Sequence, residues 1–110
     1  MPGKYEIKKA KNGQFHFNLK SSNGEIILSS EMYKVKRSAR NGISSVQKNS
    51  PDASRYERRV SKKGQPYFVL KAANHQVIGQ SEMYESAKAM DNGIKSVQKN
   101  GAAVKVEDLS

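Results

Sequence analysis

Two glutamates, Glu31 and Glu82, are the residues of this chain whose type and spacing best suit acid–base chemistry. Each belongs to a Ser-Glu-Met-Tyr segment, Ser30–Tyr33 in one half of the chain and Ser81–Tyr84 in the other. Two carboxylates that converge in one pocket are the arrangement used for proton transfer. Turn geometry, packing of the tyrosines and favourable charge near a helix N-terminus explain the same residues without chemistry, and we favour that interpretation.

A second group of residues could bind anions. Four basic side chains open a predicted helix in the first half, whereas the matching stretch 85–91 carries mixed charge. Residues 1–50 contain ten basic and three acidic side chains, and residues 51–110 contain ten and seven. Lysine and arginine on one surface bind phosphates and release counterions. The candidate site for nucleic acid is therefore Lys34, Lys36, Arg37 and Arg40, and a solvated basic helix face is the alternative.

Other chemistry has little support in the sequence. One face of the predicted sheet would carry a few aromatic and basic side chains, and it resembles a binding platform for single-stranded nucleic acid only in outline. The residues on this face are His16, Asn18, Lys20, Tyr67, Val69 and Lys71. Neither histidine has a second ligand at metal-binding spacing, and the chain has no cysteine. Phosphate-loop, nucleophile-elbow and zinc-protease motifs are absent from the sequence. We therefore predict no catalytic residue, no metal site and no cofactor.

The elements that must position these residues come from a tandem duplication. A shift of 51 positions pairs the chain with itself without a gap, and 22 of the 46 pairs formed by residues 5–50 are identical. The longest match is Ser45–Asn49 with Ser96–Asn100. The chain is therefore one unit written twice.

Each unit predicts three strands and a helix. Apolar residues alternate with polar ones through 4–8 and 14–20, with a hairpin turn at Asn12-Gly13, and 25–28 suggests a third strand. Beyond Tyr33 the apolar spacing becomes helical. Ser86 suits the N-cap of the second helix, whereas Val35 occupies that place in the first, so the first helix should fray more. Gly42 and Gly93 fall inside the helices, where close packing of helix on sheet is the favoured explanation.

The strands that follow the helices predict how the copies combine. The stretch 53–60 runs straight into the start of copy two, so we expect one long central strand that crosses between the copies. The final stretch, Val104–Val106, should pair beside Tyr5–Ile7. The sheet is then shared, with a pseudo-twofold axis. The expected organisation is a single domain with repeat 1 at about 4–53, repeat 2 at about 54–106 and a tail at 107–110.

Three motif blocks, present in both copies, resemble the YegP-like family of small uncharacterised bacterial proteins. The blocks are Ser-Glu-x-Tyr, Asn-Gly-Ile and Ser-Val-x-Lys-Asn, at Ser30–Asn49 and Ser81–Asn100. The resemblance covers essentially the whole chain. It implies an α+β fold of two β(3)-α-β repeats that form one antiparallel sheet, with exchanged C-terminal strands and two helices packed on it. It implies no activity, and the chain departs from the commoner pattern at Met32, Met83 and Val35.

Composition limits what such a protein can do. Only 35% of residues are hydrophobic, so a thin core has to be shared by both copies. The net charge of +10 attracts polyanions and favours a soluble monomer. No apolar run has the length of a signal peptide or membrane span, so we expect a bacterial-type cytoplasmic location and no membrane partner. We predict a non-catalytic binding or protein-interaction module. The alternative is a module that binds nucleic acid or a ribonucleoprotein through the first helix, and an enzyme is the least favoured class.

Overall fold

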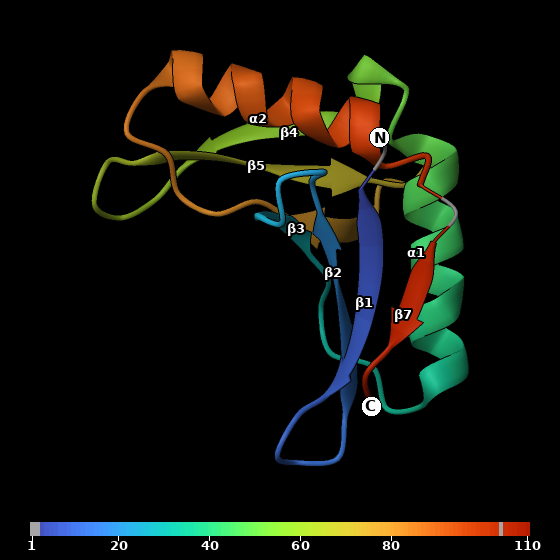
Figure 1. Cartoon of the computed structure of the whole chain (residues 1–110). Helices are drawn as coiled ribbons and strands as arrows, with labels where there is room; N and C mark the ends of the chain where they lie inside the picture. The colour runs from blue at the N-terminus through green and yellow to red at the C-terminus, as the bar shows by residue number, and fades with distance from the viewer. Residues whose placement is uncertain (1–2, 104) are drawn as a thin grey trace.

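The computed structural model describes residues 3–103 and 105–110. Within these residues, each copy provides three antiparallel strands followed by a helix (Figure 1). Copy one contains β1 (Lys4–Lys9), β2 (Phe15–Lys20), β3 (Ile26–Ser29) and α1 (Lys36–Asn49). Copy two contains β4 (Tyr56–Val60), β5 (Pro66–Lys71), β6 (Val77–Gln80) and α2 (Ala87–Asn100). A short 3-10 helix, η1 (Ala53–Arg55), joins the copies, and β7 (Val106–Asp108) follows α2.

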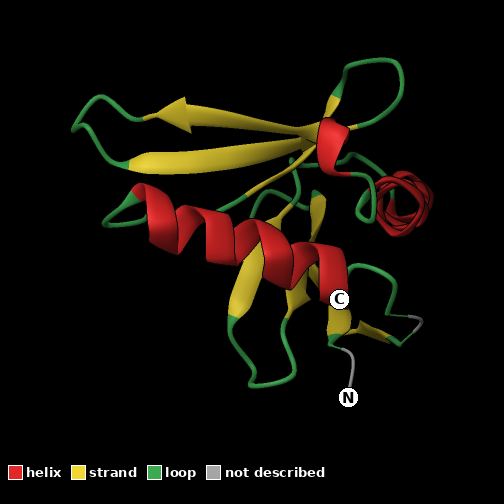
Figure 2. Cartoon of the chain, turned by 90° about the horizontal axis from the view of Figure 1, so that it is seen from above, coloured by secondary structure: helices red, strands yellow, loops and turns green. Residues whose placement is uncertain are grey.

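The strands form one seven-stranded sheet in the order β4-β5-β6-β3-β2-β1-β7. The copies meet where β3 pairs with β6, and the pair that joins them is Ser29 with Gln80, which are equivalent positions of the repeat. The pseudo-twofold axis therefore passes through this pair. The sheet is strongly twisted, so that copy-one strands run vertically and copy-two strands horizontally in Figure 1, with α1 to the right and α2 above. Seen from above, α2 crosses between the two halves (Figure 2).

The predicted fold class is confirmed, with three differences in the strands. Strand β7 does pair beside Tyr5, as expected, but it runs parallel to β1, so the sheet is mixed. The expected long central strand does not form, because β4 lies at the edge of the sheet and pairs with β5 alone. Only copy two therefore contributes a C-terminal strand, β7, that pairs with a strand of the other copy. Strand β7 also includes two residues of the expected tail, and Val104 lies outside the described residues.

Local hydrogen bonding explains why no strand forms directly after α1. The Asp52 side chain accepts a hydrogen bond from the Ser54 N–H at 2.9 Å and caps η1. The backbone N–H of Tyr56 then donates to the Ala53 carbonyl rather than to a neighbouring strand. The outer edge of β4 stays uncovered, and residues that β7 buries in copy one face solvent in copy two. Ile7 is fully buried beside β7, whereas its counterpart Arg58 is exposed.

The glycines inside the helices are explained by tyrosines that pack beneath them. Tyr33 stacks on Phe17 with ring centroids 6.4 Å apart, and a Cβ at Gly42 would approach the Tyr33 hydroxyl to 2.6 Å. In copy two, Tyr84 occupies the same space under Gly93. The prediction of close packing is confirmed. The Tyr and Gly of the repeated motifs are thus one packing unit, which brings helix and sheet together.

The other repeated motif residues stabilise turns and helix ends. The Ser30 hydroxyl accepts from the Phe17 N–H at 2.8 Å and donates to the Glu31 carbonyl, and Ser81 does the same in copy two. Asn49 donates its side-chain amide to the Ser45 carbonyl near the end of α1. As predicted, Ser86 caps α2 by accepting from the Ala89 N–H, whereas Val35 gives α1 no side-chain cap.

Two positions differ between the copies because each faces its own counterpart across the axis. Leu28 packs over Gly79, and a Cβ at Gly79 would lie 2.6 Å from a Leu28 methyl carbon. Gly101 likewise leaves room for the buried Ser50 side chain. Two large side chains do not fit at a self-facing position, so the duplicated sequence pairs a large residue with glycine there.

Candidate binding sites

The four basic residues predicted as an anion site lie at the start of α1, and two of them pair with an acidic residue of β7. Lys36 and Arg40 both contact the Asp108 carboxylate, at 2.9 and 3.3 Å. Hydrogen bonds from Ser110, followed by the Lys36 contact, hold the pKa of Asp108 below its usual value. Lys34 and Arg37 are exposed and form no ion pair within the described residues.

The charge difference between the two helices therefore has a partly structural cause. Arg40 is equivalent to Asp91, and Asp91 pairs with Arg58 of β4 at 3.0 Å. In copy one, α1 provides the cations and β7 provides the acidic residue. In copy two the signs are reversed, because α2 provides the acidic Asp91 and β4 provides the cationic Arg58. The sequence did not predict the pairing of Lys36 and Arg40 with Asp108, because residues 107–110 were expected to form a tail.

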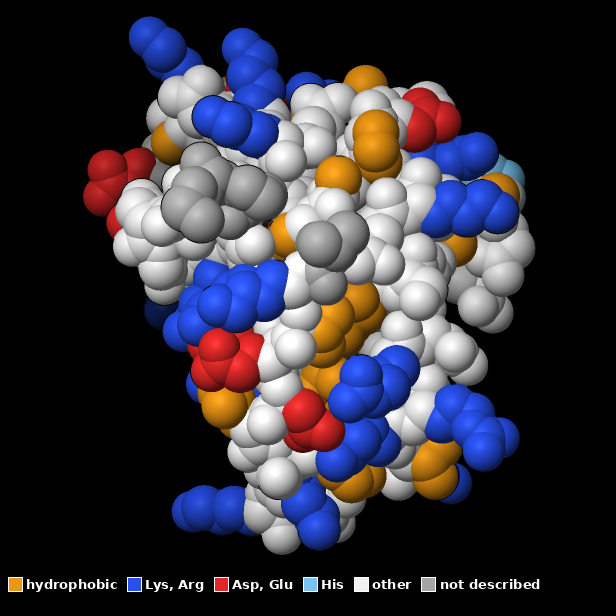
Figure 3. Space-filling view, turned by 45° about the vertical axis from the view of Figure 1, so that its right-hand side comes forward, with side chains coloured by type: hydrophobic (Ala, Val, Ile, Leu, Met, Phe, Trp, Pro, Cys, Tyr) orange, Lys and Arg blue, Asp and Glu red, His pale blue; other side chains and the backbone are white. Residues whose placement is uncertain are grey.

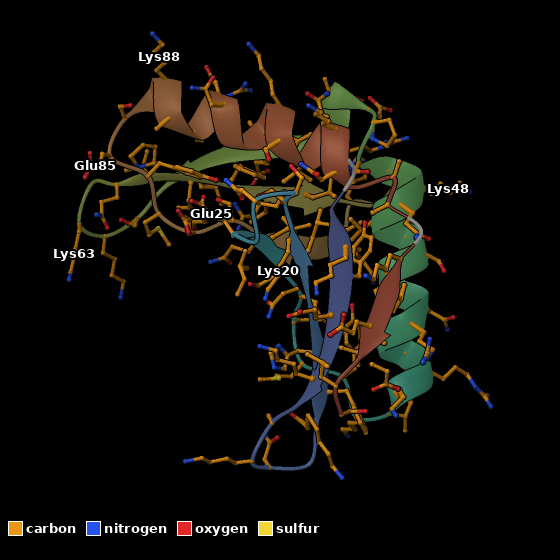
Figure 4. The ribbon with its side chains drawn as sticks, viewed as in Figure 1. Lys20, Glu25, Lys48, Lys63, Glu85 and Lys88 are labelled. Atoms are coloured by element: carbon orange, nitrogen blue, oxygen red, sulfur yellow. The ribbon has the colours of Figure 1, made fainter. Side chains whose placement is uncertain are left out.

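The basic surface also extends beyond α1. Lys9 on β1 and Lys36 on α1 both lie over the Phe15 ring, at 5.8 and 5.7 Å from its centre. Figure 3, which brings α1 and β7 forward, shows Lys and Arg side chains at the lower end of the molecule with acidic side chains beside them. We call Lys9, Lys34, Lys36, Arg37 and Arg40 the basic pole. At the equivalent end of copy two, the labelled Lys63 and Glu85 have opposite charge (Figure 4).

The sheet face expected to resemble a nucleic-acid platform is largely closed. Val69 and Asn18 are buried, and the other four predicted residues are only half-exposed. Beside them, the buried Glu6 contacts Lys20 at 3.1 Å and Lys4 at 3.4 Å. Burial opposes ionisation of Glu6, but these two ammonium groups outweigh it and hold the pKa of the carboxyl below its usual value. This face stabilises the sheet rather than presenting flat rings.

The histidines have ordinary structural places. His75 is exposed and adopts a positive φ of 69° in a turn where copy one has Gly24 at 87°. His16 is half-buried on β2. No three His, Asp or Glu side chains of the described chain gather in a way that could hold a metal ion.

Glu31 and Glu82 are brought to one cavity, which the sequence alone did not establish. A cavity of about 390 Å³ opens over the junction of β3 and β6, and both glutamates line it. Its apolar lining includes Ile26, Leu28 and Val77. Both glutamate side chains are exposed, and neither forms an ion pair or hydrogen bond within the described residues. The cavity lies on the pseudo-twofold axis, and we call it the axis cavity.

The duplication separates the residues that the fold uses from those that it does not. The repeated Tyr33, Gly42, Ser30 and Asn49 and their counterparts in copy two have packing or hydrogen-bonding partners. Glu31 and Glu82 are also identical in the two copies, as are the adjacent Met32 and Met83, which are 49% and 39% exposed. Exposed Asn41, Lys48 and their repeats also form no side-chain hydrogen bond or ion pair within the described residues. What distinguishes the two glutamates is that they line one cavity together.

The fold and the site define the class of protein: a tandem-repeat α+β module whose two copies share one sheet, with a cavity large enough for a ligand on the axis between them. The family model described as "Domain of unknown function (DUF1508)" matches residues 10–57 and 61–108, so it matches twice, at the spacing of the internal repeat. The UPF0339 protein YegP of Yersinia pestis is 67% identical over 108 residues, which cover 98% of this chain and 96% of that protein. YegP of Escherichia coli K12 is 50% identical, with 98% of both chains covered.

Solved structures agree with these matches. The solution NMR structure of UPF0339 protein SO3888 from Shewanella oneidensis superposes with a TM-score of 0.93 at 57% identity, covering 99% of this chain and 92% of that one. The NMR structure of E. coli yegP, titled a protein of unknown function, gives 0.94 at 50% identity, covering 99% and 94%. The chain belongs to the YegP-like family of UPF0339 proteins. These relatives have no assigned activity, and no helix among the described residues is long and apolar enough to cross a membrane.

Proposed function

We propose that the protein is a non-catalytic binding module that recognises a basic, extended segment of a partner protein at the axis cavity. One observation carries this proposal: two glutamates, identical in both copies and without a side-chain ion pair or hydrogen bond within the described residues, line one cavity. Carboxylates without intramolecular partners suit cationic side chains. Met32 and Met83, which follow the glutamates in sequence and lie outside the cavity lining, are exposed apolar side chains of the adaptable kind used at recognition surfaces.

The strand register suggests what the segment looks like. Glu31 and Glu82 each lie two residues beyond the central Ser29–Gln80 pair, in opposite directions. At about 3.3 Å per residue, their Cα atoms are on the order of 13 Å apart. An extended peptide places residues i and i+4 at about that spacing on one face, with i+2 between them. The matching pattern is basic–x–apolar–x–basic, with the apolar side chain over Ile26, Leu28 and Val77.

The same geometry favours binding over catalysis. Two of the serines that line the cavity, Ser30 and Ser81, already donate their hydroxyls to backbone carbonyls at 2.8 Å. The cavity lining contains no histidine to act as a base. Recognition of a cationic ligand uses the two carboxylates of the cavity without requiring proton transfer.

Peptide binding tests the proposal. A labelled peptide with an Arg-Ser-Leu-Ser-Arg core should bind the wild-type protein, and a Gln-Ser-Leu-Ser-Gln peptide should bind more weakly. Each exposed ion pair contributes up to about 1 kcal/mol, so E31Q/E82Q should weaken binding by up to about 30-fold. The matched control is E25Q/E85Q, which removes the same charge from exposed glutamates outside the cavity lining. Equal losses in the two double variants would show that only net charge attracts the peptide.

A further inference from the structure

We propose that the basic pole binds the phosphate backbone of a nucleic acid, and that Asp108 competes with the phosphates for two of its cations. The proposal is independent of the axis cavity. The basic pole contains five cations drawn from β1, α1 and the turn before α1. Four contacts link β1, α1 and β7 here: Lys9 and Lys36 lie over one Phe15 ring, and Lys36 and Arg40 contact one Asp108 carboxylate oxygen.

The duplication provides an internal comparison for this surface. The five positions of the basic pole correspond to Val60, Glu85, Ala87, Lys88 and Asp91 in copy two. The same backbone positions therefore carry five positive charges in one copy, and one positive and two negative charges in the other. Asp108 explains Lys36 and Arg40, but no ion pair within the described residues uses Lys34, whose counterpart is acidic. A structural requirement alone does not account for this remaining charge.

The start of α1 adds a second feature that favours an anion. Neither helix has an acidic residue in its first turn, but α1 has no side-chain cap, whereas the equivalent end of α2 is capped by Ser86. Cations at a helix N-terminus oppose the helix dipole, and a bound phosphate would reverse that unfavourable arrangement. Phe15 is already flanked by two ammonium groups, so it is not free to stack on bases. Recognition should therefore follow the backbone and show little sequence preference.

The dependence of binding affinity on salt concentration gives a quantitative prediction. With Lys36 and Arg40 held by Asp108, three cations remain for phosphates, and a single strand then gives a slope of log K against log salt of about −2. Between 50 and 200 mM salt, such a slope lowers the affinity about 20-fold. D108N releases two cations, so the slope should steepen to about −3.5 and binding at 50 mM salt should strengthen. Because D108N is expected to gain affinity, its effect cannot be explained by unfolding of the variant.

The test uses a fluorescein-labelled, mixed-sequence single-stranded RNA of 20 nucleotides, titrated at several salt concentrations. K34E/R37E should flatten the slope and lower affinity at 50 mM salt at least tenfold, whereas K88E/K95E, with the same charge change on α2, should keep the wild-type slope. D91N frees Arg58 in copy two and controls for D108N. The proposal is overturned if wild-type protein shows no binding at 50 mM salt, if both double variants lose affinity equally, or if D108N and D91N have the same slope.

Discussion

A double-mutant cycle at the axis tests the architecture most sharply. Leu28 is 1% exposed, and a Cβ added at Gly79 would lie 2.6 Å from one of its methyl carbons and 2.7 Å from its Cγ. Gly79→Ala removes backbone freedom from the unfolded chain, which alone would stabilise a strand by about 0.5–1 kcal/mol. Overpacking against Leu28 costs about 1–3 kcal/mol and outweighs that gain. The single change should therefore lower the free energy of unfolding by about 1–2 kcal/mol.

The second change should reverse the sign of the first. Leu28→Ala leaves a cavity and costs about 2–5 kcal/mol. In that background Gly79→Ala meets no methyl group, fills part of the cavity and recovers the backbone term, so it should become neutral or stabilising. The expected coupling between the two sites is about 1–3 kcal/mol, well above the roughly 0.3–0.5 kcal/mol within which independent sites add.

Urea unfolding followed by far-UV circular dichroism measures all four proteins of the cycle, with the transition midpoint and slope reported for each. Gly79→Ala combined with D108N, a surface change on β7, is the control and should be additive. If the cost of Gly79→Ala were the same with Leu28 and with Ala at that position, the two residues would not face each other across the axis and the reasoning would fail.

Three further predictions concern single sites. Gly93→Ala should destabilise the protein despite the helix preference of alanine, because the added Cβ would clash with the Tyr84 hydroxyl. Adding Tyr84→Phe to that variant should recover part of the loss, and thermal unfolding measures both effects. Val35→Ser should stabilise the protein by about 0.5–1.5 kcal/mol by supplying the missing cap, and Ser86→Ala should cost a similar amount in urea unfolding. The pKa of Glu6 is lowered in the folded state, so its contribution is present at neutral pH and is lost as the pH falls through the acid range; Glu6→Gln should therefore show a smaller loss of stability between pH 5 and 3.

Local pattern was enough to predict the fold class but not the fate of each strand. The alternation of apolar and polar residues around Phe17 and the helical spacing of apolar residues around Ile43 are local patterns. Each pattern occurs in both copies of the repeat. The direction of β7 depends on the path that the chain takes after α2, which no local spacing encodes. The expected central strand failed because Asp52 caps a 3-10 turn, a short-range signal that an Asp-x-Ser pattern after Pro51 already indicated.

The candidate sites depended even more on distant contacts. The partner of Lys36 and Arg40 is Asp108, about 70 positions away, and only correct placement of β7 could have identified it. The meeting of Glu31 and Glu82 in one cavity follows from the β3–β6 junction, because that pair sets the axis. Subtracting one copy from the other pointed to charge differences. The opposite comparison looks for residues that are identical in both copies, have no partner in the fold and share one site, and it identifies the glutamates. It requires the structure, which shows which residues have partners.

Chemical-shift mapping by NMR of the Arg-Ser-Leu-Ser-Arg peptide on the labelled protein tests the central claim most directly. If the axis cavity is the binding site, backbone signals around Glu31 and Glu82 should shift together and fit one dissociation constant, while signals of the basic pole stay in place. Shifts confined to one copy, shifts centred elsewhere, or an unchanged response in E31Q/E82Q would contradict it.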